Sequence, residues 1–321
     1  MERFKSSFLT NQVFIYVALY AALYSKNRCL CFLHNNNNNN NIFSSCCSRL
    51  SFNGRIWSNK LYNYSRPRTG LHRHNNMIKM NGKKHGLNER SFRRRQGTLT
   101  KGQRAAIRNL WPKYGIDLIY GECLPPLPQL FGSRFTNSSK TVLEIGFGTG
   151  SNLVSLAKEN PDKMFIGIEV HKPGVGATLK KLEQSEIKNV KLIMADAMKA
   201  LCENFEETEI IDEVLVLFPD PFPEERETNR RLIRKNFILE LQKILKPEAT
   251  LHIATDVRAY ADHSKSLLEN MRGWNSCSTD ETGFIERPSW RRIITKYEQR
   301  GLQLGNSIYE LKFVFNGKYK K

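Results

Sequence analysis

The chain has 321 residues, of which 40% are hydrophobic and 25% are charged. This apolar fraction is enough to build a core, so the composition excludes a chain that is disordered throughout. The formal net charge is +19, but residues 1–95 alone contribute a surplus of +15, from 17 Lys and Arg against Glu2 and Glu89. The rest of the chain is only mildly basic, so net charge by itself gives no argument for nucleic-acid binding.

The first 89 residues are predicted to be a targeting leader that does not fold. Residues 13–24 form an apolar run after Arg3 and Lys5, with the length of a signal-peptide core; an uncleaved membrane anchor is the alternative. A basic segment follows, with no acidic residue before Glu89. The combination resembles the bipartite leaders of secondary plastids, the apicoplast type in particular, and a mitochondrial presequence is the alternative. We expect no stable membrane association of the mature protein.

From residue 90 onward, patterns typical of strands alternate with patterns typical of helices. Strands are expected at 142–145, 165–169, 191–194, 213–218 and 250–254, and helices at 101–110, 152–159, 175–184, 230–244 and 260–271. Apolar strands separated by helices predict a mainly parallel sheet with helices on both faces. We therefore expect one α/β domain at 90–321, which begins with an arm. The scattered Cys and His residues of the chain predict no metal site.

A glycine-rich turn follows the first expected strand and contains Gly146, Gly148 and Gly150. Glycines allow the backbone to turn sharply and to approach a ligand closely, and the next helix begins with free N–H groups. Glu169 ends a second apolar strand about twenty residues later, where a carboxylate can bind a ribose diol. The sequence therefore predicts a site for a nucleoside-containing cofactor.

Two classes of cofactor use this arrangement. The dinucleotide motif G-x-G-x-x-G needs Gly or Ala where this chain has Ser151. Glu144 followed by G-x-G-x-G instead resembles the class I methyltransferases, which have a Rossmann-like, mainly parallel seven-stranded sheet and bind S-adenosylmethionine. This resemblance implies that Glu144 reaches the cationic methionine end of the cofactor and that Asp196 binds the adenine amino group. Capping of a helix is the alternative role for Asp196.

The most specific segment is Phe-Pro-Asp-Pro at residues 218–221, where two prolines stiffen the backbone around Asp220. A rigid turn without chemistry is the alternative. With Arg230 and Arg231 after it, the segment resembles the tRNA (guanine-N7)-methyltransferase family of bacterial type, over residues 90–315. This implies methyl transfer to N7 of the variable-loop guanosine at position 46 of tRNA. Because N7 has a free lone pair, no general base is needed, and Asp220 is predicted to lie beside the cofactor, orient the guanine and stabilise its charge.

The same resemblance implies substrate-binding residues in the arm, in the basic helix, after the fifth strand and in the segment 295–301: Arg95, Arg230, Asp256, Thr295 and Glu298. Capping of the next helix is the alternative for Asp256, and a surface ion pair with Arg300 or Lys296 is the alternative for Glu298. Contacts with tRNA phosphates are predicted for three basic clusters. These are Arg93, Arg94 and Arg95; Arg230, Arg231, Arg234 and Lys235; and Arg287, Arg291 and Arg292.

The chain departs from the family pattern after Pro221, where Phe222, Glu224 and Glu225 occupy positions that are usually aromatic Trp and basic residues. We expect this to change tRNA affinity or preference and not the reaction. Two other functions stay open: a class I methyltransferase with another substrate, and a non-catalytic RNA-binding protein of the same fold. No obligatory protein partner is expected.

Overall fold

The computed structural model describes residues 91–92, 97–119, 121–205, 210–291 and 293–317. All of them belong to the compact unit Met80–Lys321. The predicted leader and the arm residue Arg95 lie outside the described residues, as do Arg93, Arg94 and Arg292. In the part that is described, no helix is long and apolar enough to cross a membrane.

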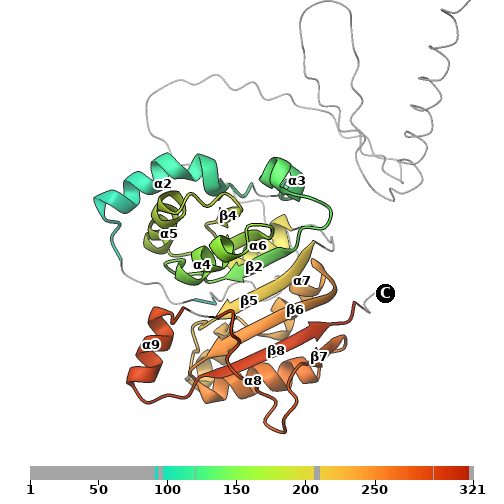
Figure 1. Cartoon of the computed structure of the whole chain (residues 1–321). Helices are drawn as coiled ribbons and strands as arrows, with labels where there is room; N and C mark the ends of the chain where they lie inside the picture. Colours follow the sequence, from blue (N-terminus) through green and yellow to red (C-terminus); the bar gives the residue numbers. More distant parts are fainter. Residues whose placement is uncertain (1–90, 93–96, 120, 206–209, 292, 318–321) are drawn as a thin grey trace, which may run out of the picture. The chain divides into compact units, whose positions relative to one another are not determined.

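A sheet of eight strands forms the centre of the domain (Figure 1), in the order β1-β4-β3-β2-β5-β6-β8-β7. The strands are β1 (Gly115–Ile116), β2 (Thr141–Ile145), β3 (Met164–Ile168), β4 (Val190–Ile193), β5 (Ile211–Leu217), β6 (Leu245–Thr255), β7 (Trp274–Ser276) and β8 (Tyr309–Phe315). From β1 to β6 in this order, each strand is parallel to its neighbour. The strand β8 is antiparallel to both β6 and β7. The mainly parallel sheet is confirmed, and the two-residue strand β1 is an addition to the seven expected strands.

The helices are α2 (Lys101–Tyr114), α3 (Leu127–Phe131), α4 (Ser151–Glu159), α5 (Lys172–Gln184), α6 (Ala197–Asn204), α7 (Lys235–Gln242), α8 (Arg258–Glu269) and α9 (Lys296–Gln303), with short 3-10 helices η1 (Gly132–Arg134) and η2 (Glu225–Arg230). The predicted start of the helix at 230–244 is wrong, because α7 begins only at Lys235. Arg230 ends η2, and Arg234 has an extended backbone at the N-cap of α7. The basic residues therefore do not line one helix.

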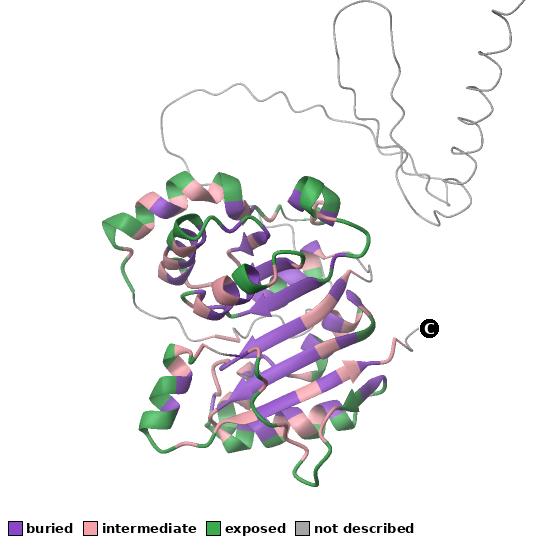
Figure 2. Ribbon diagram, viewed as in Figure 1, coloured by how far each residue is buried: buried purple, intermediate pink, exposed green. Residues whose placement is uncertain are grey.

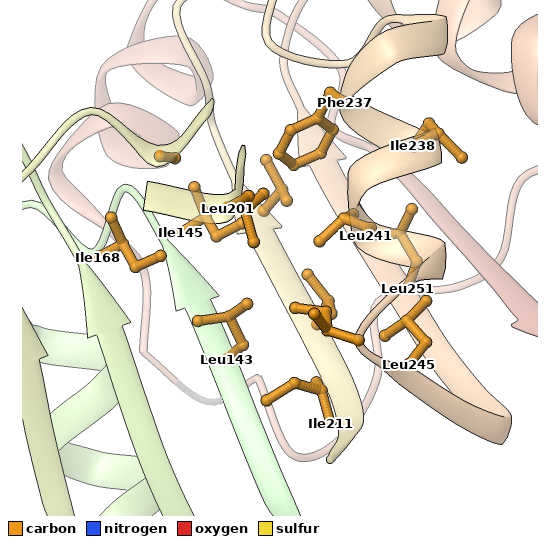
Figure 3. Packing of buried hydrophobic residues seen from close by; sticks show 14 of the residues in the cluster. Leu143, Ile145, Ile168, Leu201, Ile211, Phe237, Ile238, Leu241, Leu245 and Leu251 are labelled. Carbon is orange, nitrogen blue, oxygen red and sulfur yellow. The ribbon is translucent and has the colours of Figure 1, made fainter. Parts of the chain in front are cut away.

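Two apolar cores lie on the two faces of the sheet because successive strand residues point to opposite sides. Leu143 and Ile145 of β2 face α6 and α7, as Figure 3 shows, while Val142 joins the core beneath α2, α4 and α5. The central strands are buried almost throughout, and the helices expose one side (Figure 2). Helices thus cover both faces, and the loops at the carboxyl ends of the parallel strands are left to form a site.

A buried network of charged side chains fixes α9 to the sheet. Arg291 is only 1% exposed; it donates two hydrogen bonds of 2.8 Å to Glu298 of α9, and its Nε donates to Glu310 of β8, also at 2.8 Å. The second carboxylate oxygen of Glu310 lies 2.6 Å from Nε2 of His252 in β6. Burying an arginine is costly unless such partners surround it. The network therefore links α9 and β8 to β6, where His252 lies 58 residues before Glu310.

We predict that Arg291→Met lowers the free energy of unfolding by about 3–5 kcal/mol. The change removes the buried charge that pairs with both carboxylates and leaves Glu298 with Arg287 and Glu310 with His252. Urea unfolding followed by circular dichroism measures this. The matched control is Arg272→Met, at an exposed arginine, which should change stability by no more than about 0.5 kcal/mol. Equal unfolding midpoints for the two variants would contradict a supporting role for the network.

Candidate active site

The glycine turn after β2 has one open side and one packed side. Gly146, Gly148 and Gly150 have φ angles of 77°, 58° and 68°, in the left-handed region that favours glycine. A Cβ added at Gly146 or Gly148 would meet nothing within 4 Å, whereas one at Gly150 would lie 2.4 Å from Thr178 of α5. The first two glycines thus face open space, where a ligand can approach the backbone, and the third allows α5 to pack closely.

Glu169 joins this turn to the end of β3. Its Oε2 accepts a hydrogen bond of 2.8 Å from the Gly148 N–H. Its Oε1 accepts two more, from the N–H groups of Val170 (2.7 Å) and His171 (2.8 Å). The carboxylate is therefore oriented by three backbone donors beside the open glycines. Oε1 already accepts two hydrogen bonds, whereas Oε2 keeps a second lone pair that can accept a hydroxyl.

Glu144 is a buried acid beneath the turn. It is 3% exposed and accepts a hydrogen bond of 3.2 Å from Asn152 of α4. Burial raises the pKa of the Glu144 carboxyl to about 7; the bond from Asn152 opposes the shift, and the nearby charge of Glu169 adds to it. Two acids in one small region favour a cation close by, which is the environment predicted for the methionine end of the cofactor.

Asp196 lies at the end of the next strand, where it is partly exposed. It is the N-cap of α6 and accepts a hydrogen bond of 3.0 Å from the Lys199 N–H. The capping role weighed for this residue is confirmed. Binding of the adenine amino group stays a prediction.

Asp220 lies in a loop with an unusual backbone at the end of β5. Phe218 and Phe222 have φ angles of 53° and 41°, values that residues with a side chain adopt rarely and at a cost in energy. Asp220 sits between them and is partly exposed. The rigidity expected from the two prolines is therefore accompanied by a left-handed residue on each side of the acid.

The two arginines of the pair have different environments. Arg230 forms an ion pair with Glu227, and its guanidinium lies over the ring of Phe222, 4.3 Å from the centroid. Arg231 is 5% exposed and donates hydrogen bonds to the carbonyls of Pro221 (3.0 Å) and Phe222 (3.4 Å). The predicted phosphate contact of Arg231 is wrong, because its side chain turns inward to these carbonyls. The same correction applies to the buried Arg291.

The residues predicted to bind substrate at the far end of the chain lie around α9. Asp256 follows β6 and accepts a hydrogen bond of 3.1 Å from Asn306. A Cβ at Gly301 of α9 would come within 2.6 Å of the Asp256 carboxylate, so the helix packs directly on this acid. The capping alternative for Asp256 is wrong, because Val257 is the N-cap of α8 and makes no side-chain cap.

Thr295 and Glu298 form the capping box that begins α9. The surface ion pair proposed as the alternative for Glu298 is wrong, since its side chain is buried against Arg291. The substrate-binding roles of Asp256, Thr295 and Glu298 stay predictions. For Glu298, any such contribution passes through the position of α9, because its carboxylate is already bound within the protein.

The sequence did not indicate three polar contacts that organise the site. Asn152 bonds to Glu144, Arg231 bonds to the carbonyls of the Asp220 loop, and Asn306 bonds to Asp256. Asn152 had a weak signal, since it is a polar residue among the apolar positions of α4 that face the sheet. Within the described ranges, no group of three or more His, Cys, Asp or Glu is placed to hold an ion.

Comparison with known proteins identifies the family. The family model described as "Putative methyltransferase" matches residues 138–311. A tRNA (guanine-N(7)-)-methyltransferase from Yersinia enterocolitica is 38% identical over 224 residues, which cover 70% of this chain and 90% of the relative. Two relatives with the same name match similarly. The one from Serratia proteamaculans is 39% identical over 70% of this chain and 90% of the relative, and the one from Nitrosococcus oceani is 37% identical over 70% of this chain and 89% of the relative. Together with the parallel sheet and its glycine turn, these matches show that the chain belongs to the tRNA (guanine-N(7)-)-methyltransferase family and has the class I methyltransferase fold.

Proposed function

We propose that this chain transfers a methyl group from S-adenosylmethionine to N7 of a guanine in tRNA, and that the guanine is that of the variable-loop guanosine at position 46. The observation that carries the proposal is the placement of the Asp220 loop and the open glycine turn on the neighbouring parallel strands β5 and β2. The relatives named as tRNA (guanine-N(7)-)-methyltransferases match over nearly their whole length.

The residues around the glycine turn fit the parts of S-adenosylmethionine. The open side of Gly146 and Gly148 leaves space for a ligand, and Glu169 is oriented to accept ribose hydroxyls. Glu144 supplies a carboxylate for the ammonium group of the methionine part, and Asp196 lies at the strand end where adenine would bind. When bound, the cofactor supplies an electrophilic methyl group on a positively charged sulfur.

The chemistry at guanine N7 determines what Asp220 has to do. The N7 lone pair forms the new N–C bond as the S–C bond breaks, so the purine gains the positive charge that the sulfonium loses. No proton has to be removed first, and Asp220 is therefore no general base. Its negative charge stabilises the positive charge that develops on the purine, and its fixed backbone keeps the carboxylate at one place while this happens.

The tRNA contacts are assigned to the exposed parts of the same edge. Asp256, on which Gly301 of α9 packs, and Thr295, the N-cap of α9, are assigned to contacts with the nucleotide. Arg230 lies at the surface of the Asp220 loop, and Arg95 is assigned to the arm by resemblance to the family. We assign recognition of the guanine base to Asp220 and the residues at this edge of the sheet. The arginines supply affinity that depends on salt concentration.

The first test is methyl transfer from labelled S-adenosylmethionine to unmodified tRNA. We expect labelled 7-methylguanosine with the wild-type chain and a value of kcat lower by about 100-fold or more for Asp220→Ala, since charge stabilisation at a reacting group is commonly worth that much. The matched control is Asp262→Ala, at an exposed acid on α8 that pairs with Arg258, and it should keep the wild-type kcat. Absence of 7-methylguanosine with the wild type would refute the function, whereas an active Asp220→Ala would refute only the role of this residue.

The raised pKa of Glu144 gives a second prediction, on stability without cofactor. Because its pKa in the folded protein is about 7 and its ordinary value is 4.5, folding favours the neutral acid. The stability that this gives is present below pH 4.5 and is lost as the pH rises to 7. Glu144→Gln should therefore gain stability relative to wild type between pH 5 and pH 8, by roughly 3 kcal/mol at most. Urea unfolding of both proteins at the two pH values measures the difference.

A bound cation should remove this penalty. Saturating S-adenosylmethionine is expected to raise the melting temperature of the wild type more at pH 8 than at pH 6, whereas Glu144→Gln should show equal increases at both. Parallel pH dependence of the wild type and the variant would argue against the placement of Glu144 at the cationic end.

We also propose that residues 1–89 form a bipartite leader for a secondary plastid. Only the composition supports this, namely the apolar run followed by a basic, acid-poor segment. Fusing residues 1–89 to a fluorescent protein in a plastid-bearing cell should direct it to the plastid, and replacing the apolar run by a polar one should abolish delivery. Accumulation of the fusion in mitochondria would support the alternative instead.

A further inference from the structure

Arg231 is a buried cation directly behind the Asp220 loop. Its side chain is 5% exposed, and its Nε and one Nη donate hydrogen bonds to the carbonyl oxygens of Pro221 and Phe222. These are the two residues that follow Asp220. A buried guanidinium requires acceptors for its N–H groups, and here the backbone of the loop provides two of them.

The backbone held in this way is under strain. Phe218 and Phe222 both have positive φ angles, which residues with a side chain keep only where their surroundings impose the conformation. At the first end, the Phe218 N–H donates to the carbonyl of Ala254 at 2.8 Å. At the second end, the bonds from Arg231 hold the two carbonyls that flank the Cα of Phe222, the residue with the positive φ angle. Arg231 thus supports the end that lies outside the sheet.

The other side of the guanidinium rests on a fixed aromatic residue. Arg231 lies over the ring of Tyr260 at 5.3 Å from the centroid, and Tyr260 is fully buried in α8. The Tyr260 hydroxyl accepts a hydrogen bond of 3.1 Å from the Ile233 N–H. Burial raises the pKa of the Tyr260 hydroxyl, so this residue stays neutral beside the guanidinium. The loop, Arg231 and α8 therefore form one connected support.

We propose that Arg231 is a positioning residue for methyl transfer, which fixes the loop that carries Asp220 and makes no contact with the tRNA. This inference rests on the proposed function and deepens it. The neighbouring Arg230 has a different environment. Its side chain is 30% exposed and lies over the ring of Phe222, so it can reach a phosphate. Two adjacent arginines thus serve different purposes.

The test compares Arg231→Lys and Arg231→Met with the wild-type chain. We expect kcat to fall at least tenfold in both, because an ammonium lacks the planar fork that bonds two carbonyls together. The Kd for S-adenosylmethionine and the dependence of tRNA affinity on salt should stay unchanged. Arg230→Met should instead lower the salt slope by about 0.7–0.9, the value of one phosphate contact. Arg272→Met is the matched control for removing an exposed arginine.

A second measurement does not depend on activity. Amide hydrogen exchange at Asp220 and Phe222, which have an N–H where the two prolines of the segment have none, should become faster in both Arg231 variants. In Arg230→Met, exchange at Asp220 should stay the same. Wild-type kcat in Arg231→Lys, or unchanged exchange in this segment, would overturn the inference, and a lower salt slope would show that Arg231 contacts tRNA. A wild-type chain without methyl transfer would refute the proposed function alone, since the exchange measurement still decides whether Arg231 holds the loop. If Arg231→Met does not fold, Arg231→Lys, which keeps the charge, carries the test.

Discussion

The parallel pairing of β2, β3, β5 and β6 is the constraint on which the rest of the site depends. Because these strands run in the same direction and in register, with Glu144 opposite both Gly167 and Leu215, they all end at one edge. The glycine turn, Glu169, the Asp220 loop and Asp256 begin at this edge. Residues more than a hundred positions apart in the sequence, such as Gly146 and Asp256, thereby come to one edge of the sheet. In a parallel sheet, such an edge is where the backbone leaves the buried layer and can meet a ligand.

Several loops at this edge are held by buried or half-buried charged groups. Glu169 ties the glycine turn to β3 with three backbone hydrogen bonds, Arg231 ties the Asp220 loop to α8, and Arg291 ties α9 to β8. Each group is costly to bury, and each has its hydrogen bonds directed to specific partners. Apolar packing could hold these segments too, but it is not directional. A reaction that depends on the positions of a few atoms requires loops with one conformation, and the charged groups impose it.

The departure of this chain from its family also has a structural explanation. Glu224, one of the two acids at the departing positions, pairs with Arg226 of the same segment, and Glu227 further along pairs with Arg230. Phe222 is fully buried, and its ring carries the guanidinium of Arg230. The acids that would repel a phosphate are thus partly neutralised within the segment, and they orient the arginines at the same time.

The sequence by itself determined the positions of the parallel strands, the glycine turn, its acidic partner and the family. These follow from local patterns: apolar runs, glycine spacing and a short motif around Asp220. It did not reveal β8 or the true start of α7, nor which arginines face inward. Arg230 and Arg231 are identical neighbours, and only the tertiary structure gives one an aromatic ring at the surface and the other two buried carbonyls. The direction of a side chain depends on what lies behind it, and for Arg291 that is a strand nineteen residues further along the chain.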